Sequence, residues 1–368
     1  MLLIKRNAGK CRIVTARSNW RCNSLRNRPE IGFSVLALEG SLSYPRYHSV
    51  EVMLTLHPLQ TSPETVLDRF NSRANNLILS GLRFVRVALE SSWATQQLPR
   101  IAEPHLVMRD KECVNDFDEI FKTNVSVSLV GLLQLISDYG GLAMKGNAID
   151  VACGPGHFTQ LLAMHGQFDA VTGVDLSEPM LNKARIRCGD SLTQRATLRF
   201  ERADATDLGM FPDNHFKLAV CSNSAHHMPD SNHLNSLISE MDRVTAGDGL
   251  VVIMDLVRPK NERLLETYWR LFGAEYARDG HVALLSDFRN SLIASWTMSE
   301  LRRAVPKRGA VNWRHLGLKP IAVNQFLVRG LDHSRHFESG DGFSDSLLPK
   351  YRKQYASYAR LGRSCVHC

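Results

Sequence analysis

The stretch Ala148 to Thr159, AIDVACGPGHFT, decides the fold. It opens with an apolar run of strand length, and Gly154 and Gly156 allow the tight turn that follows. A helix is expected directly after the glycines, with its free N–H groups directed into the space beside them. The stretch therefore predicts a strand, a glycine turn and a helix that together hold a ligand close to the backbone.

Apolar runs of strand length alternate with amphipathic segments through the middle of the chain. In the clearest amphipathic segment, residues 234–244 have apolar side chains at helical spacing, and Asp230 or Ser231 is the expected N-cap. This alternation predicts βαβ units and a doubly wound, mostly parallel sheet with helices on both faces. The expected strands are 148–152, 170–175, 197–201, 216–221 and 249–256.

The ligand of such a sheet lies at the carboxyl ends of its strands. Asp175 ends the second strand, 21 residues after Gly154, where a carboxylate can accept both hydroxyls of a ribose. Asp204 leaves the third strand and is followed by Ala205, whose N–H is suited to the edge of an adenine. A nicotinamide dinucleotide site would have Gly or Ala in place of Thr159, which argues against a dehydrogenase.

Together these three motifs resemble those of the class I S-adenosylmethionine-dependent methyltransferases, over about residues 101 to 330. The resemblance implies a seven-stranded Rossmann-like sheet that ends in an antiparallel pair, expected at 314–321 and 323–328, and S-adenosylmethionine as cofactor. The family most often has Gly where this chain has Ala152, and Ala is without cost there only if its φ is negative. The cofactor-binding residues that the resemblance implies are Asp150, Ala152, Gly154, Gly156, Asp175, Leu176, Asp204, Ala205 and Ser222.

The segment after the fourth strand, SNSAHHMPD, lies where this family meets both the methyl donor and the acceptor. It resembles the "HH" variant of small-molecule methyltransferases and lacks the N/D-P-P-Y/F/W motif of enzymes that methylate nucleobase amines or glutamine amides. We expect His226 or His227 to act in catalysis or to orient the acceptor. Two adjacent side chains of an extended chain point to opposite sides, so a structural role for one of them is the alternative.

Insertions between the fifth and sixth strands form the substrate lid in the resembled family, which places a helical lid at about residues 258–305. The alternative for each pocket candidate is a core or solvated side chain. Thr297 and Glu300 have the spacing of a capping box at the start of a helix. The acceptor-pocket candidates are Asn223, Arg258, Tyr268, Arg289, Asn290 and Trp296.

The net charge of +8 comes entirely from the first part of the chain. Residues 1–100 hold 14 Lys and Arg against 6 Asp and Glu, which leaves 31 of each sign for residues 101–368. We expect a basic extension over residues 1–98, disordered in its first 30 or so residues, and a tail over 331–368 with a short helix. A cytoplasmic location is expected, or a mitochondrial one if the Arg-rich start is a transit peptide.

The expected function is methyl transfer from S-adenosylmethionine to O, N or C of a small-molecule acceptor. This chemistry requires no metal, and no cluster of ligands in the sequence suggests one. No apolar run reaches the roughly 18 to 20 residues that span a bilayer. Two alternatives stay open: an RNA or protein methyltransferase that uses the basic arm, although nucleic acid is the less favoured partner, and a non-catalytic interaction module with a degenerate site.

Overall fold

A computed structural model describes residues 87, 89–103, 114–115, 117–119, 127–189, 196–278, 280–306, 313–317 and 323–330. The chain divides into two units, Met1–Pro58 and Leu59–Cys368, and every described residue belongs to the second. The predictions for the first 30 residues and for the tail 331–368 fall outside the described residues. Within the described ranges, no helix has both the length and the apolar character needed to cross a membrane.

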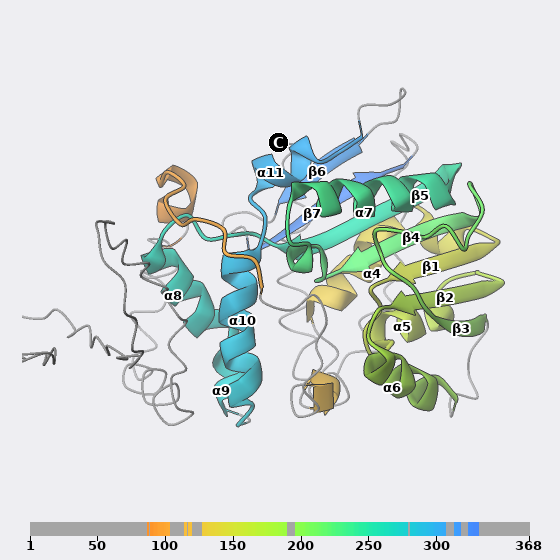
Figure 1. Cartoon of the computed structure of the whole chain (residues 1–368), viewed down its shortest axis with the longest axis horizontal. Helices are drawn as coiled ribbons and strands as arrows, with labels where there is room; N and C mark the ends of the chain where they lie inside the picture. Colours follow the sequence, from red (N-terminus) through yellow and green to blue (C-terminus); the bar gives the residue numbers. More distant parts are fainter. Residues whose placement is uncertain are drawn as a thin grey trace, which may run out of the picture. The chain divides into compact units, whose positions relative to one another are not determined.

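Seven strands form one sheet in the order β3-β2-β1-β4-β5-β7-β6 (Figure 1). Five of them, from β3 to β5 in this order, are parallel, and β7 runs antiparallel to both β5 and β6. This confirms the predicted doubly wound, mostly parallel sheet with its antiparallel pair. The strands are β1 (Asn147–Val151), β2 (Ala170–Asp175), β3 (Thr197–Arg202), β4 (Phe216–Ser222), β5 (Thr245–Leu256), β6 (Trp313–Gly317) and β7 (Asn324–Arg329).

The strand order reverses beside β1, because β2 pairs with one edge of β1 and β4 with the other. In a parallel sheet this reversal opens a crevice at the carboxyl ends of the two central strands. The predicted glycine turn leaves β1 at that point. Strand order alone therefore places the ligand site where the sequence motifs gather.

Both faces of the sheet are covered, and alternate residues of each strand supply the two cores. On β5, Val251 and Ile253 belong to the core that packs against α7 (Ser231–Val244). Leu250, Val252 and Met254 belong to the opposite core, which includes α4 (Val127–Asp138) and α5 (His157–His165). Figure 1 shows α7 on one side of the sheet and α5 and α6 (Glu178–Gly189) on the other.

Two predicted helix caps are present. Asp230 is the N-cap of α7, and its side chain accepts hydrogen bonds from the backbone N–H groups of Asn232 and His233. Thr297 and Glu300 form the predicted capping box at the start of α11 (Met298–Arg303). Both caps use local side chains to satisfy N–H groups that a helix leaves free, which is why the sequence alone could identify them.

The segment between β5 and β7 folds into α8 (Glu262–Phe272), α9 (Ala274–Arg278), α10 (Val282–Ala294) and α11. Leu264, Leu265 and Trp269 on α8 pack with Leu285 and Leu292 on α10 in a separate apolar core. Figure 1 shows α8 and α10 side by side, away from the sheet. The predicted lid region is therefore a small helical layer with a core of its own.

The packed body extends N-terminal to its expected start at residue 101. Leu98 is buried in the same core as α8, and the backbone N–H groups of Gln97 and Leu98 both donate to the carbonyl of Lys260. Residues 97–103 therefore follow the loop that leaves β5. This path brings the residues after Pro99 to the carboxyl end of the sheet.

Candidate active site at the carboxyl ends of the strands

The glycine turn after β1 contains two glycines with left-handed backbones and different surroundings. Gly154 has φ +55°, and an added Cβ there would find no atom within 4 Å. Gly156 has φ +77°, and its Cβ would lie 2.8 Å from the Ala184 Cβ and 3.1 Å from the Phe200 ring. Gly156 therefore allows the turn to pack against α6 and β3, whereas Gly154 leaves open space in front of the backbone.

Asp175, at the end of β2, is hydrogen-bonded to the glycine turn beside that open space. Its Oδ2 accepts the N–H of Gly154 at 2.8 Å, and its Oδ1 accepts the N–H of Ser177 at 2.7 Å. Burial raises the pKa of this carboxyl. A carboxylate has about four acceptor positions, so two bonds leave capacity for two hydroxyl donors. The side chain is half-buried and fits the ribose-binding role predicted for it.

Ala152 lies at the start of the turn with φ +57°. The condition under which Ala would be without cost, a negative φ, is therefore not met. An L-residue with a Cβ is strained in this region by about 1–2 kcal/mol, which explains why glycine suits the position. The chain carries this strain at the point where the glycine turn begins.

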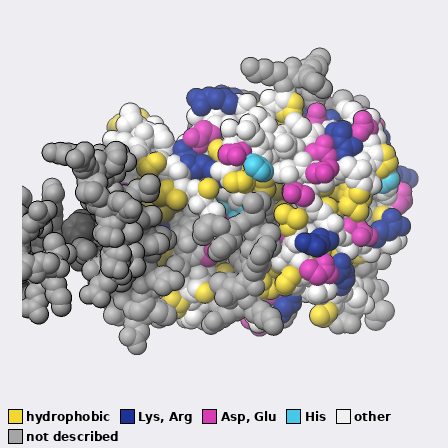
Figure 2. All heavy atoms as spheres, in the orientation of Figure 1, with side chains coloured by type: hydrophobic (Ala, Val, Ile, Leu, Met, Phe, Trp, Pro, Cys, Tyr) yellow, Lys and Arg dark blue, Asp and Glu magenta, His cyan; other side chains and the backbone are white. Residues whose placement is uncertain are grey.

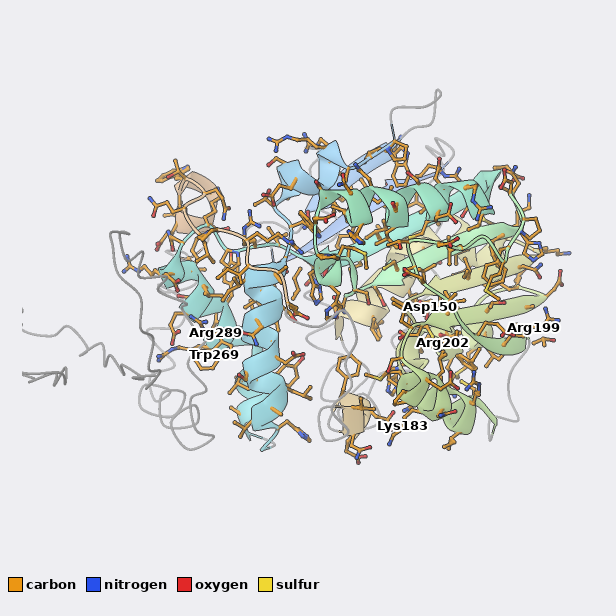
Figure 3. The ribbon with its side chains drawn as sticks, in the orientation of Figure 1. Asp150, Lys183, Arg199, Arg202, Trp269 and Arg289 are labelled. Carbon is orange, nitrogen blue, oxygen red and sulfur yellow. The ribbon has the colours of Figure 1, made fainter. Side chains whose placement is uncertain are left out.

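Asp150 lies beneath the turn, on β1 (Figure 3). Its Oδ2 accepts a hydrogen bond from the Thr159 hydroxyl at 2.6 Å, which ties β1 to α5, and its Oδ1 has no hydrogen-bond partner among the described residues. Burial raises the pKa of Asp150 to about 7. The side chain is 1% exposed, so the structure gives it a supporting place behind the turn, and its contact with a cofactor stays a prediction.

The remaining predicted cofactor residues leave the neighbouring strands. Asp204 is half-buried after β3, and its Oδ1 accepts both the N–H and the hydroxyl of Thr206 at 2.8 and 2.7 Å. Ala205 is buried, whereas Leu176 and Ser222 are half-buried at the ends of β2 and β4. All four leave carboxyl ends of parallel strands, and their contacts with a cofactor stay predictions.

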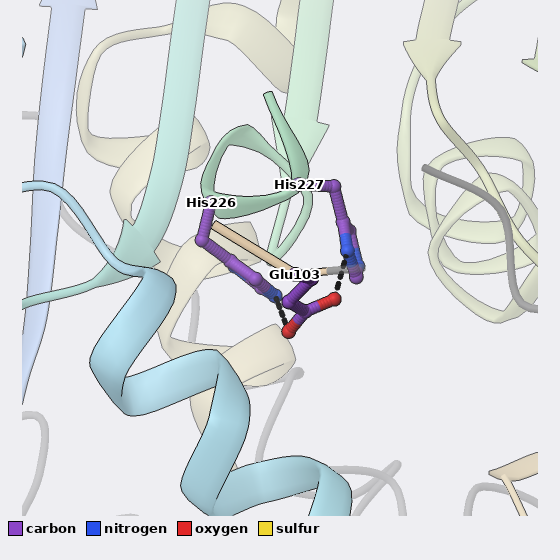
Figure 4. Close-up of side chains that lie close together, drawn as sticks. All are labelled: Glu103, His226 and His227. Atoms are coloured by element: carbon purple, nitrogen blue, oxygen red, sulfur yellow. Dashed lines mark ion pairs between the residues drawn. The ribbon is translucent and has the colours of Figure 1, made fainter. Parts of the chain in front are cut away.

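The two predicted catalytic histidines both point toward one carboxylate (Figure 4). The chain after β4 forms a short 3-10 helix, η2 (Ala225–His227), in which adjacent side chains need not oppose each other. His226 Nε2 lies 3.9 Å from Glu103 Oε1, and His227 Nδ1 lies 2.5 Å from Glu103 Oε2. Opposed histidines were expected only for an extended chain, and the 3-10 turn does not meet that condition.

Asp255, at the end of β5, completes this cluster from behind. Its Oδ1 lies 2.6 Å from His226 Nδ1, and both side chains are almost fully buried. Burial alone would lower the pKa of His226, but the negative charge of Asp255 outweighs it and raises the pKa to about 9. Burial would likewise raise the pKa of Glu103, but the two histidines lower it to about 2.

Arg100 fixes the segment that delivers Glu103. Its guanidinium lies 3.7 Å above the Trp296 ring and donates to the carbonyls of Pro229 and His226, at 2.8 and 3.0 Å. It also donates to the carbonyls of Met228 and Ala294, at 2.5 and 2.6 Å. One side chain therefore joins residues 98–103 to the loop that carries both histidines.

Sequence reasoning missed Glu103, Asp255 and Arg100. Asp255 carried a signal, because it is a single acidic residue in the long apolar run of β5. Glu103 and Arg100 carried none, because their partners lie more than 120 residues away in the chain.

The structure brings together a set of potential metal ligands that the sequence does not indicate. Glu103, His226 and His227 each offer a ligand atom, and these atoms lie within 4.8 Å of one another. No spacing in the sequence predicts this arrangement, because two of the ligands are adjacent and the third comes from a separate segment.

Four acceptor-pocket candidates have partners within the protein. Tyr268 is 2% exposed and donates to Ser91 Oγ at 3.1 Å, and buried Trp296 donates its indole N–H to the Ala225 carbonyl at 2.8 Å. Buried Arg258 pairs with Glu300 at 2.8 Å, and Arg289 lies 3.6 Å from Glu262 (Figure 3). The structure gives Tyr268, Trp296 and Arg258 packing roles.

Asn290 is exposed on α10, whereas Asn223 lies in the site loop. Asn223 follows β4 with φ +52°, and its N–H donates to the Met254 carbonyl at 2.8 Å. Its place beside η2 is consistent with the acceptor side of the site. Acceptor contact by any of the six candidates stays a prediction.

The glycine turn lies next to the histidine cluster, which consists of Glu103, His226 and His227. The Ser224 hydroxyl, between β4 and η2, lies within hydrogen-bonding distance of the carbonyls of Ala152 and Ser222, at 3.4 and 3.1 Å. The charge of His227 also acts on the carboxyl of Asp175 and lowers its pKa against the effect of burial. A ligand bound at the glycine turn would therefore lie next to the histidines.

Residues 148–249, which run from β1 into β5, match the family model described as "Methyltransferase domain". The chain is 33% identical over 125 residues to a demethylmenaquinone methyltransferase of Desulfitobacterium hafniense, which covers 34% of this chain and 47% of that protein. It is 31% identical over 144 residues to a ubiquinone biosynthesis O-methyltransferase of Methylococcus capsulatus, covering 39% of this chain and 55% of that protein.

A third relative, a trans-aconitate 2-methyltransferase of Methylobacterium nodulans, is 28% identical over 212 residues, which cover 51% of this chain and 77% of that protein. The chain spans about half the length of the first two relatives. Residues 148–249 are thus similar to a methyltransferase domain, and the strand order and the glycine turn with Asp175 agree with that similarity.

Proposed function

We propose that this protein transfers a methyl group from S-adenosylmethionine to a small-molecule acceptor at O, N or C. The observation that carries the proposal is the open space in front of the Gly154 backbone, which lies beside Asp175 and next to the cluster formed by Glu103, His226 and His227. The open space offers a place for the nucleoside of the cofactor, and the histidine cluster offers polar groups for an acceptor. A transfer reaction needs both a donor site and an acceptor site.

S-adenosylmethionine supplies a methyl group activated by a sulfonium charge, which a lone pair of the acceptor attacks as the carbon–sulfur bond breaks and its electron pair stays on sulfur. The protein's own contribution is position. Asp175 has free acceptor capacity for the ribose hydroxyls, and the missing side chain of Gly154 lets the cofactor approach the backbone. These groups are the ones that a ribose and a close backbone approach require.

His227 is the histidine that an acceptor can reach, because its side chain is 26% exposed and that of His226 is 4% exposed. We assign His227 the acceptor-orienting role. His226, with a pKa of about 9, is protonated at neutral pH when no other cation is bound, so it cannot accept a proton. Its place between Asp255 and Glu103 makes it a positioning residue.

The named relatives support a small-molecule acceptor. Their names refer to demethylmenaquinone, ubiquinone biosynthesis and trans-aconitate, all of which concern small molecules. The eight basic residues that favour RNA lie within residues 1–28, outside the described residues. On the face shown in Figure 2, the described Lys and Arg side chains are interspersed with Asp and Glu. That face therefore offers no comparable support for a polyanionic partner.

Calorimetry with S-adenosylhomocysteine tests the proposal. We expect the wild type to bind and Asp175→Ala to bind more than tenfold more weakly, because charge-assisted hydrogen bonds to the ribose would contribute about 1.5–3 kcal/mol. Glu178→Ala, three residues further on the exposed start of α6, is the matched control and should bind like the wild type. A folded wild type that does not bind would overturn the proposal and favour the non-catalytic module.

A further inference from the structure

We propose that Glu103, His226 and His227 bind one divalent transition-metal ion at the acceptor side of the site. Two imidazoles and one carboxylate form a set used for Zn²⁺ and for other first-row metals. The binding itself does not depend on the proposed methyl transfer. The use of the metal to hold an acceptor oxygen does rest on that function.

The ligand atoms already lie around a common point. Those of all three residues lie within 4.8 Å of one another, and Figure 4 shows both rings directed at the Glu103 carboxylate. Ligands about 2.0–2.2 Å from one ion lie roughly 3–4 Å apart. The 3.9 Å between His226 Nε2 and Glu103 fits this range, and the 2.5 Å between His227 Nδ1 and Glu103 would have to widen by several tenths of an ångström.

The surroundings of His227 Nδ1 are consistent with a missing metal ion. Its Nδ1 is buried and, although Glu103 is close, it has no hydrogen bond of acceptable geometry among the described residues. Glu103 and His227 nevertheless attract each other, because His227 lowers the pKa of the Glu103 carboxyl. A cation bound by both groups would take the place of this poorly aligned contact.

His226 is oriented as a metal ligand is normally oriented. Asp255 holds Nδ1 at 2.6 Å, so a proton on Nδ1 leaves the lone pair of Nε2 directed toward Glu103. A carboxylate behind a ligating histidine sets the tautomer and increases the basicity of the ligand. Asp255 is 1% exposed, its Oδ1 also accepts the backbone N–H of Leu256 at 2.7 Å, and its Oδ2 has no partner among the described residues.

The loop that carries both histidines is held in place from outside the cluster. Arg100 donates to the His226 carbonyl at 3.0 Å, and Trp296 donates to the Ala225 carbonyl at 2.8 Å. These bonds restrain η2 without using either imidazole. A site whose ligands are restrained before binding loses less entropy when the ion arrives.

The local charge favours a cation. Three carboxylates, Glu103, Asp255 and Asp287, act on the two imidazoles, and burial together with the charge of Glu103 raises the pKa of Asp287. Arg100 is the cation that acts on Glu103 and Asp255. With both histidines neutral, the carboxylates around them would outnumber this cation, and a divalent ion would reduce the excess of negative charge. Imidazole ligands favour Zn²⁺ or Co²⁺ over Mg²⁺ and Ca²⁺.

Three protein ligands leave at least one coordination position open. That position would face the space next to His227, where an acceptor is expected. A hydroxyl or carboxylate oxygen of the acceptor could then bind to the ion and be held beside the methyl donor. The ligand class that the site would select is therefore an oxygen-bearing small molecule.

Titration of the chelator-treated full chain with Zn²⁺ in a calorimeter tests the inference, with Co²⁺ as a second probe whose visible absorption reports nitrogen ligands. We expect one ion per chain. Glu103→Gln and His227→Gln should each weaken binding at least tenfold, and Asp255→Asn should weaken it about 10–100-fold through His226. His233→Gln, which changes an exposed histidine paired with Asp230, is the matched control and should not affect binding.

Each sample is also tested for S-adenosylhomocysteine binding and for a cooperative thermal transition. A folded wild type that binds S-adenosylhomocysteine but no stoichiometric metal would overturn the metal site and leave the proposed function intact. Equal metal affinity in wild type and Glu103→Gln would also overturn it. Metal binding without S-adenosylhomocysteine binding would instead count against the proposed function alone.

Discussion

The glycine turn and the histidine cluster differ in how the chain builds them. The turn and its partner Asp175 come from two consecutive strands, and their hydrogen bond joins residues 21 positions apart. The cluster joins Glu103, the η2 histidines and Asp255, and Arg100 ties its first segment to a loop 126 residues away. The cofactor side of the site is formed by residues close in the chain, so the sequence reveals it. The acceptor side is formed by contacts between distant segments, so the sequence does not.

Each of the two regions contains a buried carboxylate on a strand, and the two carboxylates have different partners. Asp150 on β1 and Asp255 on β5 are both 1% exposed. Asp255 has a histidine within 2.6 Å, whereas the hydrogen-bond partner of Asp150 is the neutral hydroxyl of Thr159. Asp150 therefore lacks a partner that could carry a positive charge, whereas Asp255 has one, which predicts different responses to neutralisation of the two carboxyl groups.

The largest expected effect is the pH dependence of Asp150→Asn. Folded Asp150 keeps its proton up to a pKa of about 7, whereas the unfolded chain releases it near 3.8. Asp150 thus binds more protons in the folded state in this window, and its contribution to the stability of the wild type falls as pH rises from 4 to 7. A rise of about three in pKa corresponds to about 4 kcal/mol.

Urea unfolding from pH 4.5 to 8 measures this effect. The stability of Asp150→Asn relative to the wild type should rise with pH across the window, even if a buried amide donor offsets part of the gain. The control is Asp169→Asn, an exposed change in the loop before β2, which should show no such trend. A constant difference between Asp150→Asn and wild type would mean that the pKa of Asp150 is not raised in the folded state.

Alanine at each of the two turn glycines separates packing from ligand binding. Gly156→Ala should lower the free energy of unfolding by about 2–4 kcal/mol, because its Cβ meets Ala184 and Phe200 in a left-handed backbone. Gly154→Ala has open space, so it should cost only about 1–2 kcal/mol of backbone strain. It should nevertheless lose most of its affinity for S-adenosylhomocysteine.

Denaturant unfolding and calorimetry on the same two variants check this prediction. Equal losses of stability in Gly154→Ala and Gly156→Ala would show that both glycines are needed only for the backbone conformation of the turn. Full S-adenosylhomocysteine affinity in Gly154→Ala would show that the open space is not the cofactor site.

Arg100→Ala tests how the cluster is held together. Loss of four hydrogen bonds to carbonyls and of the contact with Trp296 should destabilise the protein by about 2–3 kcal/mol. Hydrogen exchange should increase mainly at residues 225–229 and around Glu103, while the glycine turn stays protected. Arg100→Lys should rescue little, because one ammonium cannot reach all four carbonyls. Uniform loss of protection would contradict a local role.

The smallest expected effect is a gain from Ala152→Gly. Relief of the positive φ should stabilise the folded state, offset by the entropy that glycine adds to the unfolded chain, for a net gain of about 1 kcal/mol or less. Thermal unfolding measures it, and affinity for S-adenosylhomocysteine should be at least maintained. A clear loss of stability would mean that the Ala152 methyl packs better than its backbone angle suggests.

Most of the sheet could be predicted from local patterns. The expected 170–175 strand agrees with β2, and the limits of β1, β3 and β4 agree to within one residue. β5 begins at Thr245 rather than at 249, because pairing with β4 resumes across an irregularity between Phe216 and Leu218 that hydrophobicity does not reveal. Arg258 and Trp296 show the same limit, since a charged or aromatic side chain in a loop does not reveal which neighbour buries it.

The sequence by itself determined the parallel sheet, the glycine turn, Asp175 and the helix caps, because each depends on interactions between residues close in the chain or on hydrophobic periodicity. The tertiary structure alone decided that both histidines face Glu103, that Asp255 supports one of them and that Arg100 joins the two segments. The physical reason is separation along the chain. Ion pairs and buried hydrogen bonds between distant segments leave no periodic trace, and chain folding alone brings their partners together.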